Sequence, residues 1–193
     1  HIKTTYRHRD QYRPQTAEAI NTIIKRTPGN IVVFFSSFRH MKQILPLLDR
    51  GERPFLIQSP GMKEQERSLF LSAMLRAEGH VLIAVMGGIF SEGIDLPQKA
   101  LLCAVMVGPA LPMANLERKQ IQAWNEEKYE KGFIYSWVVP GMARVAQAAG
   151  RVIRTPEDRG VVVLIGNRFR QTAYRECLPA EWFPTIPRDL DVE

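Results

Sequence analysis

Two arginines three positions apart, Arg151 and Arg154, are the residues whose type and spacing point most directly to chemistry. In a helix, residues three apart are neighbours, so both guanidinium groups would share a face with Gln147, one turn upstream. Each guanidinium is a flat, permanently charged fork that suits phosphate oxygens. The spacing therefore favours a surface that holds the phosphates of a nucleotide, and the plainer interpretation is a solvated basic edge of a helix.

A second group, Ser36, Ser37 and Arg39, directly follows the apolar run at residues 31–35. Hydroxyls and free backbone N–H groups at the start of a helix suit a phosphate, so this loop is a candidate for contact with one. The alternative interpretation is that Ser37 simply caps the helix.

The loop at residues 86–97 is dense in glycine and polar groups. It contains Gly87, Gly88, Ser91, Glu92, Gly93 and Asp95. Glycines let the backbone take positive φ and approach a ligand closely. On this reading Ser91 touches a phosphate and Asp95 accepts a hydrogen bond from a ribose hydroxyl. The alternative is a glycine-rich turn with solvated carboxylates.

The elements that must position these loops alternate along the chain. Short apolar runs between turn residues predict buried strands at 31–35, 55–57, 81–85, 101–107 and 161–165, with a further candidate at 133–139. Amphipathic stretches predict helices at 16–25, 38–48, 63–77, 116–131 and 144–154. The alternation indicates a doubly wound α/β fold with a mostly parallel sheet, whose ligands gather at the carboxyl ends of the strands.

Length and composition fit one domain. The chain has 193 residues, and its 26 Lys and Arg against 20 Asp and Glu give a net charge of +6, which permits an anionic partner such as nucleic acid. No apolar run approaches the roughly 20 residues of a membrane span, so we expect no membrane association. Cys103 lies in an apolar run and is expected to be buried, and two cysteines are too few for an iron–sulfur cluster.

Histidines and the chain ends add little chemistry. His8 and His40 have no partners at metal-ligand spacing, so we predict no metal site. We expect residues 1–13, rich in arginine, to form a solvated arm that includes Arg9, and residues 178–193 to form an extended tail.

Together these loops resemble the second RecA-like motor domain of superfamily 2 helicases, in particular the XPD/DinG group of DNA helicases. Residues 32–38 look like motif IV, residues 87–95 like motif V, and residues 147–154 with the following strand like motif VI. The resemblance covers residues 14–175 and implies that residues 1–193 form a single RecA-like domain.

The resemblance implies an ATP-driven motor that moves along single-stranded DNA, usually from 5′ to 3′. Arg151 and Arg154 would be arginine fingers that stabilise charge during phosphoryl transfer. The nucleotide would also border Gln147, Glu92, Gly93 and Asp95. The DNA backbone would contact Ser36, Arg39 and Ser91.

The sequence lacks a G-x-x-x-x-G-K-[ST] phosphate loop and an Asp-Glu-x-His box. We therefore expect ATP and Mg²⁺ to be held mainly by a first motor domain of the same parent, and the isolated chain to be inactive as an ATPase. The four cluster cysteines of many relatives are absent as well. The expected location is the cytoplasm, at the nucleoid in a prokaryote.

Three alternatives remain open from the residues. The chain could be a non-catalytic nucleic-acid-binding module of the same fold, or half of an RNA helicase. A small-molecule α/β enzyme that uses the glycine loop is disfavoured, because residues 87–93 do not match G-x-G-x-x-G.

Overall fold

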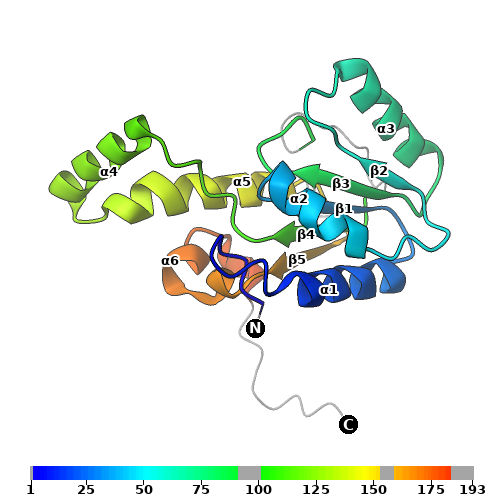
Figure 1. The fold of residues 1–193 in the computed structure, drawn as a ribbon, viewed down its shortest axis with the longest axis horizontal. Helices are drawn as coiled ribbons and strands as arrows, with labels where there is room; N and C mark the ends of the chain where they lie inside the picture. Colours follow the sequence, from blue (N-terminus) through cyan, green and yellow to red (C-terminus); the bar gives the residue numbers. More distant parts are fainter. Residues whose placement is uncertain (1, 91–100, 153–158, 184–193) are drawn as a thin grey trace, which may run out of the picture.

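The computed structural model describes residues 2–90, 101–152 and 159–183 (Figure 1). Its strands are β1 (Ile31–Phe35), β2 (Phe55–Ile57), β3 (Val81–Val85), β4 (Cys103–Val107) and β5 (Val161–Ile165). Its α-helices are α1 (Arg13–Arg26), α2 (Phe38–Ile44), α3 (Glu64–Arg76), α4 (Leu116–Tyr129), α5 (Val139–Ala149) and α6 (Thr172–Arg175). Short helical turns lie at Leu45–Leu47, Ile134–Val138, Asn167–Arg170 and Ala180–Trp182.

Within these residues the strands form one parallel sheet in the order β2-β3-β1-β4-β5. Phe35, the last residue of β1, pairs with Val85 of β3 and with Val107 of β4. Because the strands are parallel and in register, their carboxyl ends meet at one edge of the sheet. The predicted α/β architecture and its five main strands are confirmed.

Alternate residues of the central strands enter two separate cores, as expected for strands covered on both faces. Ile31, Val33 and Phe35 pack with α1 and α2. Val32 and Phe34 pack with Met74 of α3 and with the apolar side of α5. Cys103 is buried as predicted. No helix among the described residues is long and apolar enough to cross a membrane.

One predicted strand, at 133–139, is wrong. Residues Ile134–Val138 form a π-helical turn that leads directly into α5. Ser136 and Val138 of this turn are buried, and the Ser136 hydroxyl accepts a hydrogen bond from Asn125 Nδ2 of α4 at 3.0 Å. Packing against α4 thus outweighs the strand preference of a short apolar run. Figure 1 shows α4 and the start of α5 projecting beyond the sheet, on the side to which the strands point.

The predicted helix at 144–154 also differs from the structure. It begins earlier, at Val139, and ends at Ala149, so Arg151 lies in the turn that follows and not on a helical face. Gly150, a residue that disfavours the interior of a helix, stands at its C-cap. Arg154 lies outside the described residues.

The expectation of a solvated arm is wrong for part of residues 1–13. Thr4 and Arg9 are buried, with 5% and 8% of their surface exposed, whereas Arg7 is exposed. The Asn167 backbone N–H donates to the Ile2 carbonyl at 2.9 Å, which ties the arm to the segment after β5. Of the predicted extended tail, residues 180–182 form a helical turn, and residues 184–193 lie outside the described residues.

Candidate nucleic-acid and nucleotide interface

The loops after β1 and β3 lie side by side at the carboxyl edge of the sheet. The Met86 backbone N–H donates to the Phe35 carbonyl at 2.9 Å, so the two strand ends are joined directly. Ser36 and the glycine loop therefore start from adjacent points, as the sequence predicts. Along the same edge, the Gly108 backbone N–H donates to the Ile165 carbonyl at 2.8 Å, which joins the ends of β4 and β5.

The loop after β1 combines a structural serine with two candidates for phosphate contact. The Ser37 hydroxyl accepts a hydrogen bond from the His40 N–H at 3.3 Å, so the N-cap interpretation of Ser37 is correct. Ser36 is half-buried beside it, and Arg39 is exposed on the first turn of α2. The Arg39 guanidinium donates to the hydroxyl of Tyr6 at 3.1 Å.

The described part of the glycine loop is held firmly at both ends. Gly87 takes a φ of +73°, which favours glycine. Gln58 accepts a hydrogen bond from the Val85 N–H at 2.9 Å and packs closely on Gly88. Phe90 is fully buried and stacks on Phe70, with ring centroids 6.0 Å apart. Ser91, Glu92, Gly93 and Asp95 lie outside the described residues.

Arg144 is a residue of this interface that the sequence analysis missed. Its side chain lies against Gly87, and its Nη1 donates to the Ala110 carbonyl at 3.5 Å. It therefore links α5 to the loops after β3 and β4. The signal was present in the sequence, because Arg144 precedes Gln147 by three residues and Arg151 by seven, which is helical spacing.

Gln147 and Arg151 lie farther along α5 and the turn after it, toward the edge of the sheet where the strands begin. Gln147 is exposed in the last turn of α5, and Arg151 is half-buried in the turn that follows. Val152 is buried against Gly160, where an added Cβ would collide with it; Gly160 immediately precedes β5. Arg151 is thus anchored near the amino end of β5, and the structure does not bring it together with Ser36.

The donors at the two edges of the sheet fit phosphate better than they fit a metal ion. Arg39, Gln147 and Arg151 supply N–H donors, which suit phosphate oxygens. Among the described residues, no group of three or more His, Cys, Asp or Glu side chains is arranged to hold a metal ion.

The arm adds cationic groups near α2. Burial lowers the pKa of Arg9; the nearby Asp10 raises it, and Arg39 lowers it further. Burial also lowers the pKa of His40 to about 4, with Arg9 acting in the same direction. His40 is therefore neutral at physiological pH and packs edge-on against Phe35, with ring centroids 5.5 Å apart.

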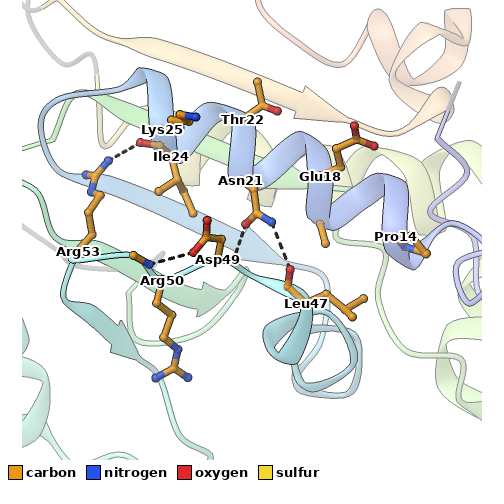
Figure 2. Close-up of a pocket in the computed structure, with 12 residues that line it drawn as sticks. Pro14, Glu18, Asn21, Thr22, Ile24, Lys25, Leu47, Asp49, Arg50 and Arg53 are labelled. Atoms are coloured by element: carbon orange, nitrogen blue, oxygen red, sulfur yellow. Dashed lines mark hydrogen bonds between the residues drawn. The ribbon is translucent and has the colours of Figure 1, made fainter.

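A cavity of about 640 Å³ lies elsewhere, along α1 and the segment between Leu47 and Arg53 (Figure 2). Several of its polar groups form hydrogen bonds within the fold. The Asn21 amide donates to the Leu47 carbonyl at 3.2 Å and accepts from the Asp49 N–H at 2.9 Å. Arg53 donates to the Ile24 carbonyl at 2.6 Å. None of the predicted site residues lines this cavity, which we interpret as structural.

Comparison with known proteins identifies relatives of this arrangement. The helicase C-terminal domain family matches residues 20–185. The chain is 30% identical over 184 residues to the general transcription and DNA repair factor IIH helicase subunit XPD/RAD3 of Saccharomyces cerevisiae, covering 87% of this chain and 23% of that protein. It is 24% identical over 209 residues to the ATP-dependent DNA helicase DDX11 of Mus musculus, covering 93% of this chain and 23% of that protein.

Solved structures show the same fold. A structure of XPD helicase superposes with a TM-score of 0.73 at 22% identity, covering 91% of this chain and 32% of that chain. The described architecture is thus that of a RecA-like helicase domain. The chain spans about a quarter of the length of the curated relatives it matches.

Proposed function

Since this chain belongs to the family of helicase C-terminal domains, within its XPD-like group of DNA helicases, we propose that it is the second motor domain of an ATP-dependent DNA helicase. Residues 1–193 would act as one domain. A first motor domain elsewhere in the parent protein would hold most of the ATP and Mg²⁺, because this sequence has no phosphate loop. The place of action would be the cytoplasm, at the nucleoid if the organism is a prokaryote.

The observation that carries the nucleic-acid part of this proposal is the hydrogen bond between Met86 and Phe35, which sets the Ser36 loop beside the glycine loop. We assign Ser36, Arg39 and Ser91 to contact with the backbone of single-stranded DNA. Such contacts read no bases, so binding is expected to tolerate any sequence and to weaken with salt.

The nucleotide part rests on the segment that ends α5. Gln147, Arg151 and Arg154, together with Glu92, Gly93 and Asp95, would face a nucleotide held by the first motor domain. A guanidinium there stabilises the negative charge that develops in phosphoryl transfer. The anchoring of Val152 beside β5 supports this role, because a charged group that acts in a transition state must be held in place.

Strand separation by the full-length protein that contains this chain tests the proposal. We expect ATP-dependent unwinding of a DNA duplex with a 5′ single-stranded overhang, and weaker or no unwinding of the matching RNA duplex. Preference for the RNA substrate would replace the proposal by an RNA helicase, and unwinding only from a 3′ overhang would reverse the polarity.

The isolated chain provides a second test. Without a phosphate loop it is expected to show no ATP turnover above the buffer blank. Turnover that Arg151→Ala abolishes would contradict the division of labour between two motor domains. A non-catalytic module, the alternative within this fold, would bind DNA in the full-length protein while showing no ATPase that depends on Arg151.

A further inference from the structure

The arm at residues 2–9 crosses the carboxyl edge of the sheet. The Ile2 carbonyl accepts from the Asn167 N–H, beyond the end of β5. Thr4 packs on two glycines, Gly108 after β4 and Gly166 after β5, where an added Cβ would stand 2.8 Å from its hydroxyl oxygen. The arm is therefore seated on the ends of β4 and β5, and it delivers the next residues to the start of α2.

Tyr6 is the residue of the arm that lies at the start of α2. It is 69% exposed, although it is a large aromatic side chain. Its hydroxyl accepts the hydrogen bond from Arg39 Nη1. The guanidinium carbon of Arg9 lies 4.7 Å from the centre of the ring, and that of Arg39 lies 5.4 Å from it. Two cations from different elements thus meet on one exposed ring.

The cluster carries two guanidinium groups, and Asp10, the carboxylate whose charge raises the pKa of Arg9, is shared with a third arginine. Asp10 forms an ion pair with Arg13 at 2.8 Å. Within the described ranges, no ion pair joins Arg9 or Arg39 to a carboxylate. Burial is the main cause that lowers the pKa of Arg9; Asp10 raises this pKa, and the Arg39 guanidinium lowers it, because like charges repel. An anion bound between them would relieve that repulsion.

We propose that Tyr6, Arg9 and Arg39 form a binding site for the phosphodiester backbone of single-stranded DNA, in which Tyr6 positions the Arg39 guanidinium. This inference rests on the proposed function, because it extends the contact surface of Ser36 and Arg39 onto the arm. One guanidinium N–H is directed to Tyr6, and the remaining donors are left to face phosphate oxygens.

The chemistry of the cluster favours a nucleic-acid strand as the anion. An exposed aromatic ring among arginines is typical of surfaces that follow a single strand without reading its bases. Tyr6 reduces the freedom of a long, flexible side chain, so that less conformational entropy is lost when Arg39 binds a phosphate.

Binding of a fluorescein-labelled oligo-dT by the full-length protein, measured by anisotropy over a series of salt concentrations, tests this site. We expect Arg39→Ala to weaken binding and to reduce the slope of log K against log salt by about 0.7, the value for one phosphate contact on a single strand. Arg26→Ala, which removes an exposed arginine at the far end of α1, is the matched control and should leave both quantities unchanged.

The Tyr6 variants separate this inference from the proposed function. Tyr6→Phe removes the hydroxyl and keeps the ring, and is expected to weaken binding about threefold; Tyr6→Ala removes both and should weaken it about tenfold. Tyr6→Phe is the more conservative change, so it keeps the test valid even where Tyr6→Ala disturbs the arm.

Two results would contradict the proposed site at Tyr6, Arg9 and Arg39. Wild-type affinity in both Tyr6 variants, with weakened binding in Arg39→Ala, would overturn the positioning role of Tyr6 and leave the proposed function standing. Wild-type affinity in Arg39→Ala would instead overturn the DNA contact assigned to the end of β1, and this site with it.

Discussion

The side chain of Arg144 lies against Gly87, such that a Cβ at that glycine would stand 3.4 Å from both Cδ and Nε of the arginine. The same guanidinium donates to the Ala110 carbonyl at 3.5 Å. Arg144 belongs to α5, the helix that also carries Gln147 and leads to Arg151. Arg144 is therefore one link through which a displacement of α5 would reach the glycine loop, beside the core packing that the two segments share.

Replacement of Arg144 by alanine is expected to loosen the glycine loop. The variant loses one hydrogen bond and the packing over Gly87, together worth about 1 kcal/mol, so amide exchange at residues 86–90 should rise about fivefold. Hydrogen–deuterium exchange with mass spectrometry measures this directly. Lys119→Ala, an exposed change on α4, is the control, and unchanged protection in Arg144→Ala would contradict the linkage.

The strands of this fold could be predicted from sequence because they are covered on both faces. Two continuous apolar runs between turn residues form the central strands Ile31–Phe35 and Val81–Val85. Because such a strand is buried on both faces, its residues do not alternate between apolar and polar. The same rule failed at 133–139, where a largely apolar run that includes Tyr135 and Ser136 packs on a neighbouring helix. Periodicity cannot distinguish these two cases when the run is short.

The parts of the site that sequence reasoning missed depend on contacts between distant segments. Tyr6 and Arg39 are 33 residues apart and meet only because Thr4 seats the arm on the glycines after β4 and β5. Arg144 and Gly87 likewise meet through the tertiary fold. The sequence analysis placed the end of α5 five residues too far along the chain. It gave more weight to the helical spacing of Gln147 and Arg151 than to the low helix propensity of Gly150.

Substitution of Gly108 by alanine is expected to cost more stability than the same change at Gly61. Both glycines have a similar positive φ, +77° and +75°, so the backbone strain of about 1 kcal/mol is shared. Only at Gly108 would the new Cβ also press on Thr4; at Gly61 nothing lies within 4 Å. Overpacking adds about 1–2 kcal/mol.

Urea unfolding of the two glycine variants measures this difference. The free energy of unfolding should fall by about 2–3 kcal/mol for Gly108→Ala and by about 1 kcal/mol for Gly61→Ala. The extra loss should shrink when Thr4→Gly is added to Gly108→Ala, since the contacting hydroxyl and methyl are then gone. Equal losses in both single variants would mean that the arm is not seated on Gly108.

Acidification is expected to destabilise the domain through His40. Burial lowers its pKa in the folded state to about 4, below its ordinary value of 6.5, so the unfolded chain binds more protons between these two pH values. The stabilisation that neutral His40 contributes to the folded state is complete above pH 6.5, and it is lost as the pH falls toward 4. At about 1.4 kcal/mol per unit of pKa, the total is about 3 kcal/mol.

His40→Met substitutes an apolar side chain of similar size for the imidazole and removes the titration. Its free energy of unfolding should therefore change less between pH 7 and pH 4.5 than that of the wild type, with other titrating groups common to both proteins. Gln15→Met, an exposed change on α1 that removes no titratable group, is the control and should retain the wild-type dependence. Parallel pH profiles for wild type and His40→Met would contradict the neutral, buried state of His40.

Substitution of Arg151 tests whether this chain supplies a catalytic group to a nucleotide that another domain holds. In the full-length protein, Arg151→Ala is expected to reduce kcat for DNA-stimulated ATP hydrolysis by about 10³-fold, the lower range for an arginine finger. Nucleotide affinity should change far less, because the interaction strengthens only as charge develops in the transition state. Arg151→Lys keeps the charge without the fork and should recover a small part of the rate.

Steady-state kinetics and nucleotide binding, measured on the same preparations, separate these effects. Arg26→Ala should match the wild type in both assays, since Arg26 is exposed at the end of α1 and belongs to neither surface. Near-wild-type kcat in Arg151→Ala would rule out the finger role. A large loss of affinity with unchanged kcat would instead make Arg151 a binding residue, because uniform binding lowers KM without accelerating the chemical step.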